Sequence, residues 1–429
     1  MSRNKTTATY ITWDGPAQNY LESLFLPIFD RAQGSDLDFT VLQFTWGDPA
    51  IRDSIAETAA SMDIPYEAHE VWRKPLKPAT AAMIAYGAAR IIRHAKQHGT
   101  TTLVPRSIIP AAMTFLARQQ LPHIDIIYDS DGFMADERVE FEGWNGQGAV
   151  YRLFREVEAH IGRIANRVVT RSHRGATIIR DRIGPLTDPD KIYVVPNGKD
   201  PELFSPGNHE QRLRTRQRLG IPKDAPFVIY AGSLSPRYLP EAIFKFFSHV
   251  YRRKSTSRLV ILTGHQESAR QYLAESQVPQ EAVLIDRVKP SAVATHLAAA
   301  DLGISFREPS FSQQGVSPIK IAEYLLCGLP VLATPGVGDV ATQIDDGVGI
   351  ICHETTDKAI AHAVEQFFDR ILKDRTNYRH QCRHKGLAQF SLQRAAEGYR
   401  DALGLNSRDK ATSESLPTFA TNKKETQSG

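Results

Sequence analysis

Cysteine is scarce in this chain, and its three cysteines follow no spacing typical of a metal site. Cys327, Cys352 and Cys382 lack the paired arrangement of zinc ligands, and Cys327 falls in an apolar context. We therefore expect reduced thiols, with no disulfide framework and no bound metal. This pattern favours a cytosolic location.

Long apolar runs are also absent. The opening residues, MSRNKTTATYITW, lack the apolar core of a signal peptide. No run approaches the roughly 18 apolar residues that are needed to span a bilayer. We expect a cytoplasmic protein that binds the inner face of the membrane at most peripherally.

Net charge is small, formally +4 over 429 residues, and gives no reason to expect a nucleic-acid partner. The charge is uneven, because residues 151–184 hold eight arginines against three acids, and residues 71–99 are also rich in basic side chains. Such local basicity suits an anionic surface or substrate. We hypothesise that residues 151–184 contact an anionic membrane surface; the alternative for any single arginine is a solvated helix face.

Residues 305–347 are the most informative part of the sequence. Pro318 suits a first helical position and Ser317 is a good N-cap, so the helix should direct its free N–H groups at the preceding loop, where an anion can bind. Lys320 in the first turn requires an anionic partner. The carboxylate of Glu323 can accept hydrogen bonds from hydroxyl groups. Together they predict a pocket for a phosphate attached to a hydroxyl-rich group; the alternative is an ordinary helix.

Strand and helix patterns alternate along the whole chain, which predicts parallel sheets with helices on both faces. Ligands of such sheets collect at the carboxyl ends of the strands. Two successive series predict two doubly wound, Rossmann-like α/β domains that face a cleft. The predicted strands are 9–13, 39–44, 66–71, 102–104, 124–128, 167–170, 192–195, 227–231, 258–263, 283–285, 302–306 and 331–334. The predicted helices are 19–32, 51–62, 79–97, 151–166, 241–251, 267–275, 290–300, a short helix from 318, and 391–403.

Several short motifs follow one another in order through both halves. In the C-terminal half they are Pro309-Ser310-Phe311-Ser312, Ser317-Pro318-Ile319-Lys320-Ile321-Ala322-Glu323-Tyr324-Leu325, Gly328-Leu329-Pro330-Val331, Gly336-Val337-Gly338-Asp339 and Tyr230-Ala231-Gly232-Ser233-Leu234. Earlier motifs are Trp13-Asp14-Gly15, Arg106-Ser107, Gly132-Phe133 with Asp136-Glu137-Arg138-Val139, and Pro196-Asn197-Gly198 with Asp200. Residues 9–404 thereby resemble a family-4 retaining glycosyltransferase of the GT-B fold, similar to bacterial members that build polysaccharides.

The resemblance implies a nucleotide-diphosphate sugar as co-substrate and a glycan or lipid-linked acceptor, with no cofactor and no metal. Transfer is expected to retain the anomeric configuration. The catalytic residues are expected to be Lys320, Arg237 and His173. Donor contacts are expected from Gly232, Ser233, Tyr238, Arg287, Val288, Ser312, Gly315, Ser317, Pro318 and Glu323. Acceptor contacts are expected from Asp14, Gly15, Arg106 and Asp131.

The expected domains follow the same division. They are an acceptor domain at 1–200, a linker at 201–223, a nucleotide-sugar domain at 224–385, a C-terminal helix at 386–405 that packs back on the first domain, and a disordered tail at 406–429.

Two departures from the family pattern affect these expectations. Members commonly have Glu where this chain has Gly315, so a carboxylate that would hold the sugar ring is missing. Arg and Lys are common in the first loop of the second domain, where this chain has Ser233 and Tyr238. We infer that Arg237 supplies charge beside Lys320, with Arg307 as a further candidate.

Some residues also have simpler explanations. His173 can be a structural group, Asp14 can cap a turn, and Arg106 can form a salt bridge with a neighbour; Asp131 is equally undecided. The function has alternatives too: a scaffold protein that binds sugar nucleotides without turnover, or a sugar-nucleotide epimerase of the same fold.

Overall fold

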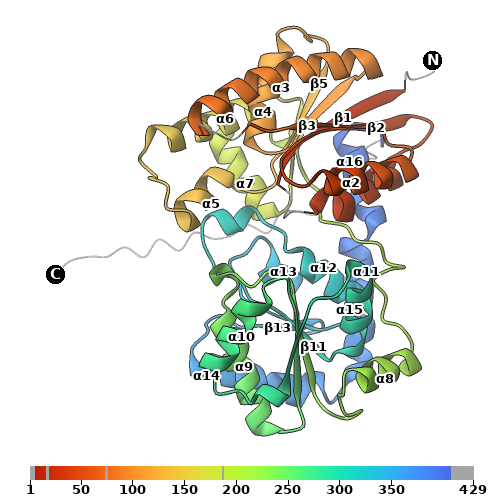
Figure 1. The fold of residues 1–429 in the computed structure, drawn as a ribbon, viewed down its shortest axis with the longest axis vertical. Helices are drawn as coiled ribbons and strands as arrows, with labels where there is room; N and C mark the ends of the chain where they lie inside the picture. Colours follow the sequence, from red (N-terminus) through yellow and green to blue (C-terminus); the bar gives the residue numbers. More distant parts are fainter. Residues whose placement is uncertain (1–4, 16–18, 73–75, 186–187, 407–429) are drawn as a thin grey trace, which may run out of the picture.

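The computed structural model describes residues 5–15, 19–72, 76–185 and 188–406. The expected disordered tail lies, from residue 407 onward, outside the described residues. Figure 1 shows two α/β lobes, one above the other, with the last helix returning to the upper lobe.

The N-terminal lobe alternates strands and helices. Its strands are β1 (Thr6–Asp14), β2 (Leu37–Thr45), β3 (Tyr66–Glu70), β4 (Thr102–Pro105), β5 (Asp125–Asp129), β6 (Arg167–Thr170) and β7 (Ile192–Val194). Its helices are α1 (Leu26–Ala32), preceded by a π-helical turn at Leu21–Phe25, then α2 (Pro49–Ser61), α3 (Leu76–His98), α4 (Ile108–Arg118), α5 (Met134–Phe141), α6 (Ala149–Ile164) and α7 (His173–Ile183).

The C-terminal lobe repeats this plan. Its strands are β8 (Phe227–Ala231), β9 (Arg258–Leu262), β10 (Val283–Asp286), β11 (Leu302–Ser305), β12 (Val331–Ala333) and β13 (Gly349–Ile351). Its helices are α8 (His209–Arg218), α9 (Pro240–Arg253), α10 (Gln266–Glu275), α11 (Pro290–Ala299), α12 (Ile319–Leu326), α13 (Val340–Gln343), α14 (Asp357–Gln366) and α15 (Arg375–Phe390); α16 (Leu392–Ala402) follows.

Both sheets are parallel and doubly wound. The described residues form a seven-stranded sheet in the order β3-β2-β1-β4-β5-β6-β7 and a six-stranded sheet in the order β10-β9-β8-β11-β12-β13. Strand order reverses beside β1 in the first sheet and beside β8 in the second, the position at which ligands bind in such folds. The predicted fold class, two facing Rossmann-like domains, is confirmed. No described helix is long and apolar enough to cross a membrane.

The faces of the first sheet are covered by different helices because successive strand residues point to opposite sides. Tyr10 packs in one core with Phe29 of α1 and Tyr399 of α16, whereas Ile11 packs in another with Met83 of α3. The last helix thus completes the first domain, as expected.

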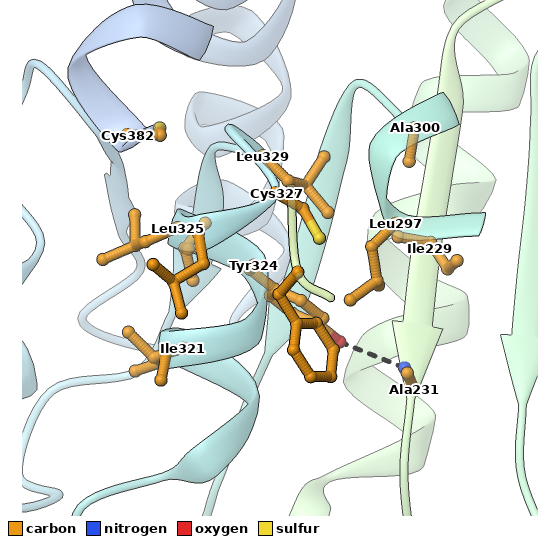
Figure 2. Packing of buried hydrophobic residues seen from close by; sticks show 14 of the residues in the cluster. Ile229, Ala231, Leu297, Ala300, Ile321, Tyr324, Leu325, Cys327, Leu329 and Cys382 are labelled. Atoms are coloured by element: carbon orange, nitrogen blue, oxygen red, sulfur yellow. Dashed lines mark hydrogen bonds between the residues drawn. The ribbon is translucent and has the colours of Figure 1, made fainter. Parts of the chain in front are cut away.

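The second domain has its own core, centred on α12. Ile321, Tyr324 and Leu325 are buried there, and the Tyr324 hydroxyl accepts a hydrogen bond of 3.0 Å from the Ala231 backbone N–H (Figure 2). The bond ties α12 to β8. Cys327 and Cys382 are buried in the same core as free thiols, and burial raises the pKa of both.

Several elements were not predicted, and α4 shows why. Seven of its eleven residues are buried, so the helix has no polar stripe from which a helical period can be read. Helices α5 and α7 were missed because each begins within a few residues of the end of a strand. The predicted strands agree with the structure to within a few residues at each end, whereas β13 was not predicted.

Removing one hydroxyl should test how α16 is held. The Tyr399 hydroxyl donates to Asp129 Oδ2 at 2.6 Å and accepts from Arg171 Nη2 at 3.0 Å, all three side chains being buried. Tyr399→Phe leaves both partners one bond short, and we expect a loss of about 1–3 kcal/mol in unfolding free energy. Thermal unfolding measures it, with Tyr272→Phe as the control, because that hydroxyl makes no hydrogen bond within the described chain. Equal melting temperatures for the Tyr399→Phe and wild-type proteins would contradict the assignment.

Candidate functional site

A cleft of about 1540 Å³ lies between the two domains, at the carboxyl ends of both sheets. One wall consists of residues that follow β1, β4 and β5, and the other of residues that follow β8 and β11 together with the start of α12. Most residues predicted for the site line it: Asp14, Gly15, Arg106, Asp131, Gly232, Ser233, Arg237, Tyr238, Arg287, Val288, Ser317, Pro318, Lys320 and Glu323. The structure does not place His173, Ser312 or Gly315 among the lining residues.

Lys320 has no salt-bridge partner in the part of the chain that the structure describes. Its Nζ is buried, forms no hydrogen bond within the described residues, and lies 4.1 Å and 4.6 Å from the ring centres of Tyr230 and Tyr238. Burial lowers the pKa of Lys320 to about 7, and the nearby Arg307 guanidinium adds to the shift. The two rings favour the ammonium form, but they do not replace an anion.

Gly232 lies beside this ammonium group in a backbone conformation that favours glycine. Its φ of +133° is a conformation that residues with side chains rarely adopt. A Cβ atom at this position would lie 3.4 Å from Lys320 Nζ, in ordinary van der Waals contact.

Arg307 is a second cation without a partner on this wall. Its guanidinium lies 5.3 Å from the ring centre of Tyr238, and its buried Nε has no hydrogen-bond partner in the described chain. Thr334 holds its backbone, since Thr334 Oγ1 accepts from the Arg307 N–H at 2.9 Å and donates to the Arg307 carbonyl at 2.6 Å. Arg307 was only a further candidate from the sequence, although its place just after β11 was a usable signal.

Arg237, which the sequence ranked above Arg307, is already paired. Its guanidinium forms a salt bridge with Glu137 of α5, across the domain boundary, and lies 5.3 Å from the ring centre of Phe141. Arg237 was expected to supply positive charge beside Lys320. In the structure this charge is already paired with the Glu137 carboxylate of the other domain.

Glu323 lies one turn beyond Lys320 and faces the cleft. Its Oε1 is 3.3 Å from the Lys199 ammonium, which also donates to the Ser23 carbonyl at 2.9 Å. The carboxylate is 18% exposed, so its remaining lone pairs are open to hydroxyl donors.

The start of α12 differs from the prediction. The helix begins at Ile319, Pro318 occupies the N-cap position with ψ of 114°, and no side chain caps the helix. Ser317 is not the N-cap; its carbonyl instead accepts a hydrogen bond of 2.7 Å from Asn197 Nδ2 of the other domain. The uncapped helix start still faces the cleft, because Ser317, Pro318 and Ile319 all line it.

The three predicted residues outside the cleft lie on a seam that joins the domains. The His173 backbone N–H donates to Asp339 Oδ2 at 2.7 Å while its side chain is exposed, and the Ser312 N–H donates to the Glu140 carboxylate at 3.1 Å. A Cβ atom on Gly315 would lie 2.8 Å from the Phe133 ring. The position where relatives carry a glutamate is thus filled by an aromatic ring from the first domain.

The acceptor-side residues form a buried ion-pair network. Arg106 Nη1 lies 2.6 Å from Asp14 Oδ1, and its Nη2 pairs with Asp131. Arg171 Nε lies 3.1 Å from Asp131 Oδ1 and its Nη2 lies 2.6 Å from Asp129 Oδ2. Burial alone would raise the pKa of Asp131, but Arg106 and Arg171 outweigh it and hold that pKa below its usual value. Of the alternatives for Arg106, the structure supports the salt bridge.

The architecture of the molecule is that of the GT-B fold. HepE from Anabaena, solved in complex with UDP and glucose, superposes with a TM-score of 0.69 at 15% identity, over 93% of this chain and 99% of that one. Sucrose-phosphate synthase from Thermosynechococcus elongatus superposes with a TM-score of 0.67 at 16% identity, over 94% of this chain and 100% of that one.

Sequence similarity links the C-terminal half of the chain to glycosyltransferases. A family model described as "Glycosyl transferases group 1" matches residues 211–388, which include the cation-bearing wall of the cleft. A D-inositol 3-phosphate glycosyltransferase from Acidothermus cellulolyticus is 31% identical over 201 residues, 44% of this chain and 42% of that protein. Its counterpart from Kineococcus radiotolerans is 27% identical over 205 residues, 45% of each chain. The matches thus cover less than half of these relatives.

The lowered pKa of Lys320 predicts that the stability of the protein depends on pH. Because the folded-state pKa of Lys320 is about 7 against an ordinary 10.5, the unfolded chain binds the proton more tightly, and stability should rise with pH between these values. Below about pH 7 the buried ammonium is a cost, so Lys320→Met should stabilise the ligand-free protein there by roughly 1–3 kcal/mol. Thermal unfolding at several pH values measures this.

The matched control is Lys385→Met, because Lys385 pairs with Asp345 and its removal should give no gain. A Lys320→Met protein that melts below wild type at every pH would rule out the assignment of Lys320 as an uncompensated cation.

Proposed function

We propose that the protein is a glycosyltransferase that moves a sugar from a nucleoside-diphosphate sugar to a glycan or lipid-linked acceptor. The observation that carries this proposal is a pair of basic side chains, Lys320 and Arg307, on one wall of the interdomain cleft; their buried Nζ and Nε atoms have no hydrogen-bond partner among the described residues. The relatives that match this chain are named as glycosyltransferases, and HepE was solved with UDP and with UDP-glucose. We place the reaction in the cytoplasm, in polysaccharide or glycoconjugate biosynthesis.

The two cations suit the departure of a nucleoside diphosphate. As the bond from the sugar to the phosphate breaks, negative charge grows on the leaving group and must be stabilised by groups already in place. Lys320 and Arg307 are buried or half-buried, so water screens them weakly and their attraction for the charge is strong. The open N–H groups at the start of α12 add partial positive charge. Such a site can carry out the transfer without a metal or a cofactor.

Other lining residues can position the donor. Glu323 can accept hydrogen bonds from ribose hydroxyls beside its contact with Lys199. Arg287 and Val288 follow β10 at the edge of the cleft, where their main chain can lie against the base. Since Gly315 provides no carboxylate, the sugar ring must be held by other groups.

The opposite wall suits a neutral, hydroxyl-rich acceptor. Asp14 and Arg106 are buried and bound to each other, so neither offers a free charge. Asp131 is 22% exposed and can accept a hydrogen bond from an acceptor hydroxyl. Trp13 and Trp46, with ring centres 6.2 Å apart, give this wall an aromatic surface on which sugar rings can stack.

We further propose that the transfer retains the anomeric configuration, on the basis of the family resemblance. Product stereochemistry, read by NMR in the first turnovers, tests this separately. The competing hypothesis is a scaffold that binds sugar nucleotides without turnover, which the occupied Gly315 position favours. Slow release of free nucleotide from the donor, without acceptor, would argue against the scaffold.

Turnover should depend on the two cations more than donor binding does. We expect Lys320→Ala and Arg307→Ala each to lower kcat by about 10²–10³-fold, because they act on charge that grows in the transition state. Arg237→Ala is the matched control, since Glu137 already neutralises that arginine. A thermal-shift screen of UDP-, GDP- and ADP-sugars first identifies the donor, and nucleotide release then measures turnover.

Two results would overturn the proposal. No stabilisation by any nucleotide sugar would exclude the donor site. Unchanged turnover in Lys320→Ala would remove Lys320 from the mechanism, and an equal loss in all three variants would restore Arg237 as a participant.

A further inference from the structure

The chain crosses between the two domains twice, and the two crossings lie side by side. The first crossing follows β7 and contains Lys199, and the second joins α15 to α16 at Ser391. The Lys199 N–H donates to the Phe390 carbonyl at 2.9 Å, and the Lys199 carbonyl accepts from the Leu392 N–H at the same distance. The backbone of Lys199 is therefore fixed at the junction of the domains.

Gly198 allows the two crossings to approach each other closely. A Cβ atom at this position would lie 2.5 Å from the Ala395 Cβ and 2.7 Å from the Ser391 carbonyl oxygen. Both distances are shorter than the contacts that Cβ atoms make in proteins, and the second is to backbone, which cannot move aside as a flexible side chain can. A larger residue would separate the crossings and displace Lys199.

The Lys199 side chain contacts both domains from this junction. Lys199 is 7% exposed, and its ammonium group donates to the Ser23 carbonyl at 2.9 Å and lies 3.3 Å from Glu323 Oε1. Ser23 belongs to the π-helical turn of the first domain, and Pro27, four residues later, has no N–H to donate to that carbonyl. One buried ammonium group thus joins a main-chain acceptor of the first domain to a carboxylate on α12 of the second.

Glu323 is a flexible side chain that a ligand can use only in certain conformations. Contact with Lys199 restrains its Oε1 and leaves the other lone pairs of the carboxylate for hydroxyl donors. A carboxylate that is already oriented loses less side-chain entropy on binding than a mobile one does. Ser23, Lys199 and Glu323 all line the interdomain cleft, so this restraint acts where the ligand is proposed to bind.

We propose that Lys199 is a positioning residue that orients Glu323 toward the ribose hydroxyls of the nucleotide. The inference rests on the proposed nucleoside-diphosphate site and deepens it, because ribose recognition then depends on a pair of residues and not on Glu323 alone. Since the same ammonium group holds Ser23, the first domain takes part in recognising the nucleotide. A lysine that only joined the domains would leave nucleotide preference unchanged.

Nucleotides that lack one ribose hydroxyl test the proposal. Affinities of the full chain for UDP, GDP and ADP are compared with those for their 2′-deoxy and 3′-deoxy counterparts by titration calorimetry. We expect wild type to bind the ribonucleotide at least about tenfold more tightly than one of its deoxy forms, as for one hydrogen bond to a charged group. In Lys199→Met this ratio should fall to about threefold or less, because Glu323 is no longer oriented.

A double variant shows whether Lys199 acts through Glu323. Glu323→Gln alone should also lower the ratio, and adding Lys199→Met to it should lower the ratio no further, because both substitutions remove the same contact. Losses that add in the double variant would contradict the positioning role. Lys199→Gln, which keeps an N–H donor in the side chain, is the second variant where Lys199→Met does not fold.

Lys191→Met is the matched control, because the Lys191 ammonium donates to the Arg163 and Ala165 carbonyls within the first domain. Its ratio should equal that of wild type. A wild type without preference for the ribonucleotide, or an unchanged ratio in Lys199→Met, would overturn the inference and leave the proposed function standing. Absence of binding of every nucleoside diphosphate by wild type would overturn both.

Discussion

The buried carboxylate of Asp129 organises the N-terminal half of the molecule. It ends β5, is fully shielded from water, and accepts hydrogen bonds from Arg171 Nη2 and from the Tyr399 hydroxyl. Through Arg171 it positions Asp131, which in turn holds Arg106 on the cleft wall. Through Tyr399 it anchors the last helix of the chain to the first sheet. A buried charge of this kind is tolerated only when its partners are in place, so the acceptor wall and the returning helix are built together.

The two walls of the cleft differ in how their charged side chains are paired. On the acceptor wall the arginines are matched with carboxylates inside the fold, which makes that wall rigid and locally close to neutral. On the donor wall Lys320 Nζ and Arg307 Nε are buried and have no hydrogen-bond partner within the described residues. The fold thus carries an electrostatic cost on the wall where a charged ligand is proposed to bind, and stability is given up at a site that is arranged for function.

Features encoded locally could be predicted from the sequence. The alternation of strands and helices, and Lys320 and Glu323 at the start of a helix, depend on residues close together in the chain. Helix α4 could not be predicted, because it is apolar on nearly every side and lacks the period that marks an amphipathic helix. The proline at position 318 was interpreted as a first helical residue, yet an extended ψ makes it the residue before the helix.

Contacts between residues far apart in the chain determine which charged side chains are free, and these contacts could not be predicted from the sequence. Arg237 and Arg307 are both arginines near a strand end, and only the position of Glu137, contributed by the other domain, shows which one is free. The arginines of residues 151–184 suggested a charged surface, but several face acids within the fold. Gly315 suggested a lost carboxylate; in the structure, a Cβ atom at this position would require the Phe133 ring to move.

The seam beside the cleft has a consequence for how a ligand enters and leaves. Glu140, Asp339 and Glu137 each grip the opposite domain along the side where α5 and α7 meet the loop after β11. Separation of the two domains on that side would break all three contacts. Ligand exchange that requires the domains to separate on that side would therefore carry the cost of breaking these contacts.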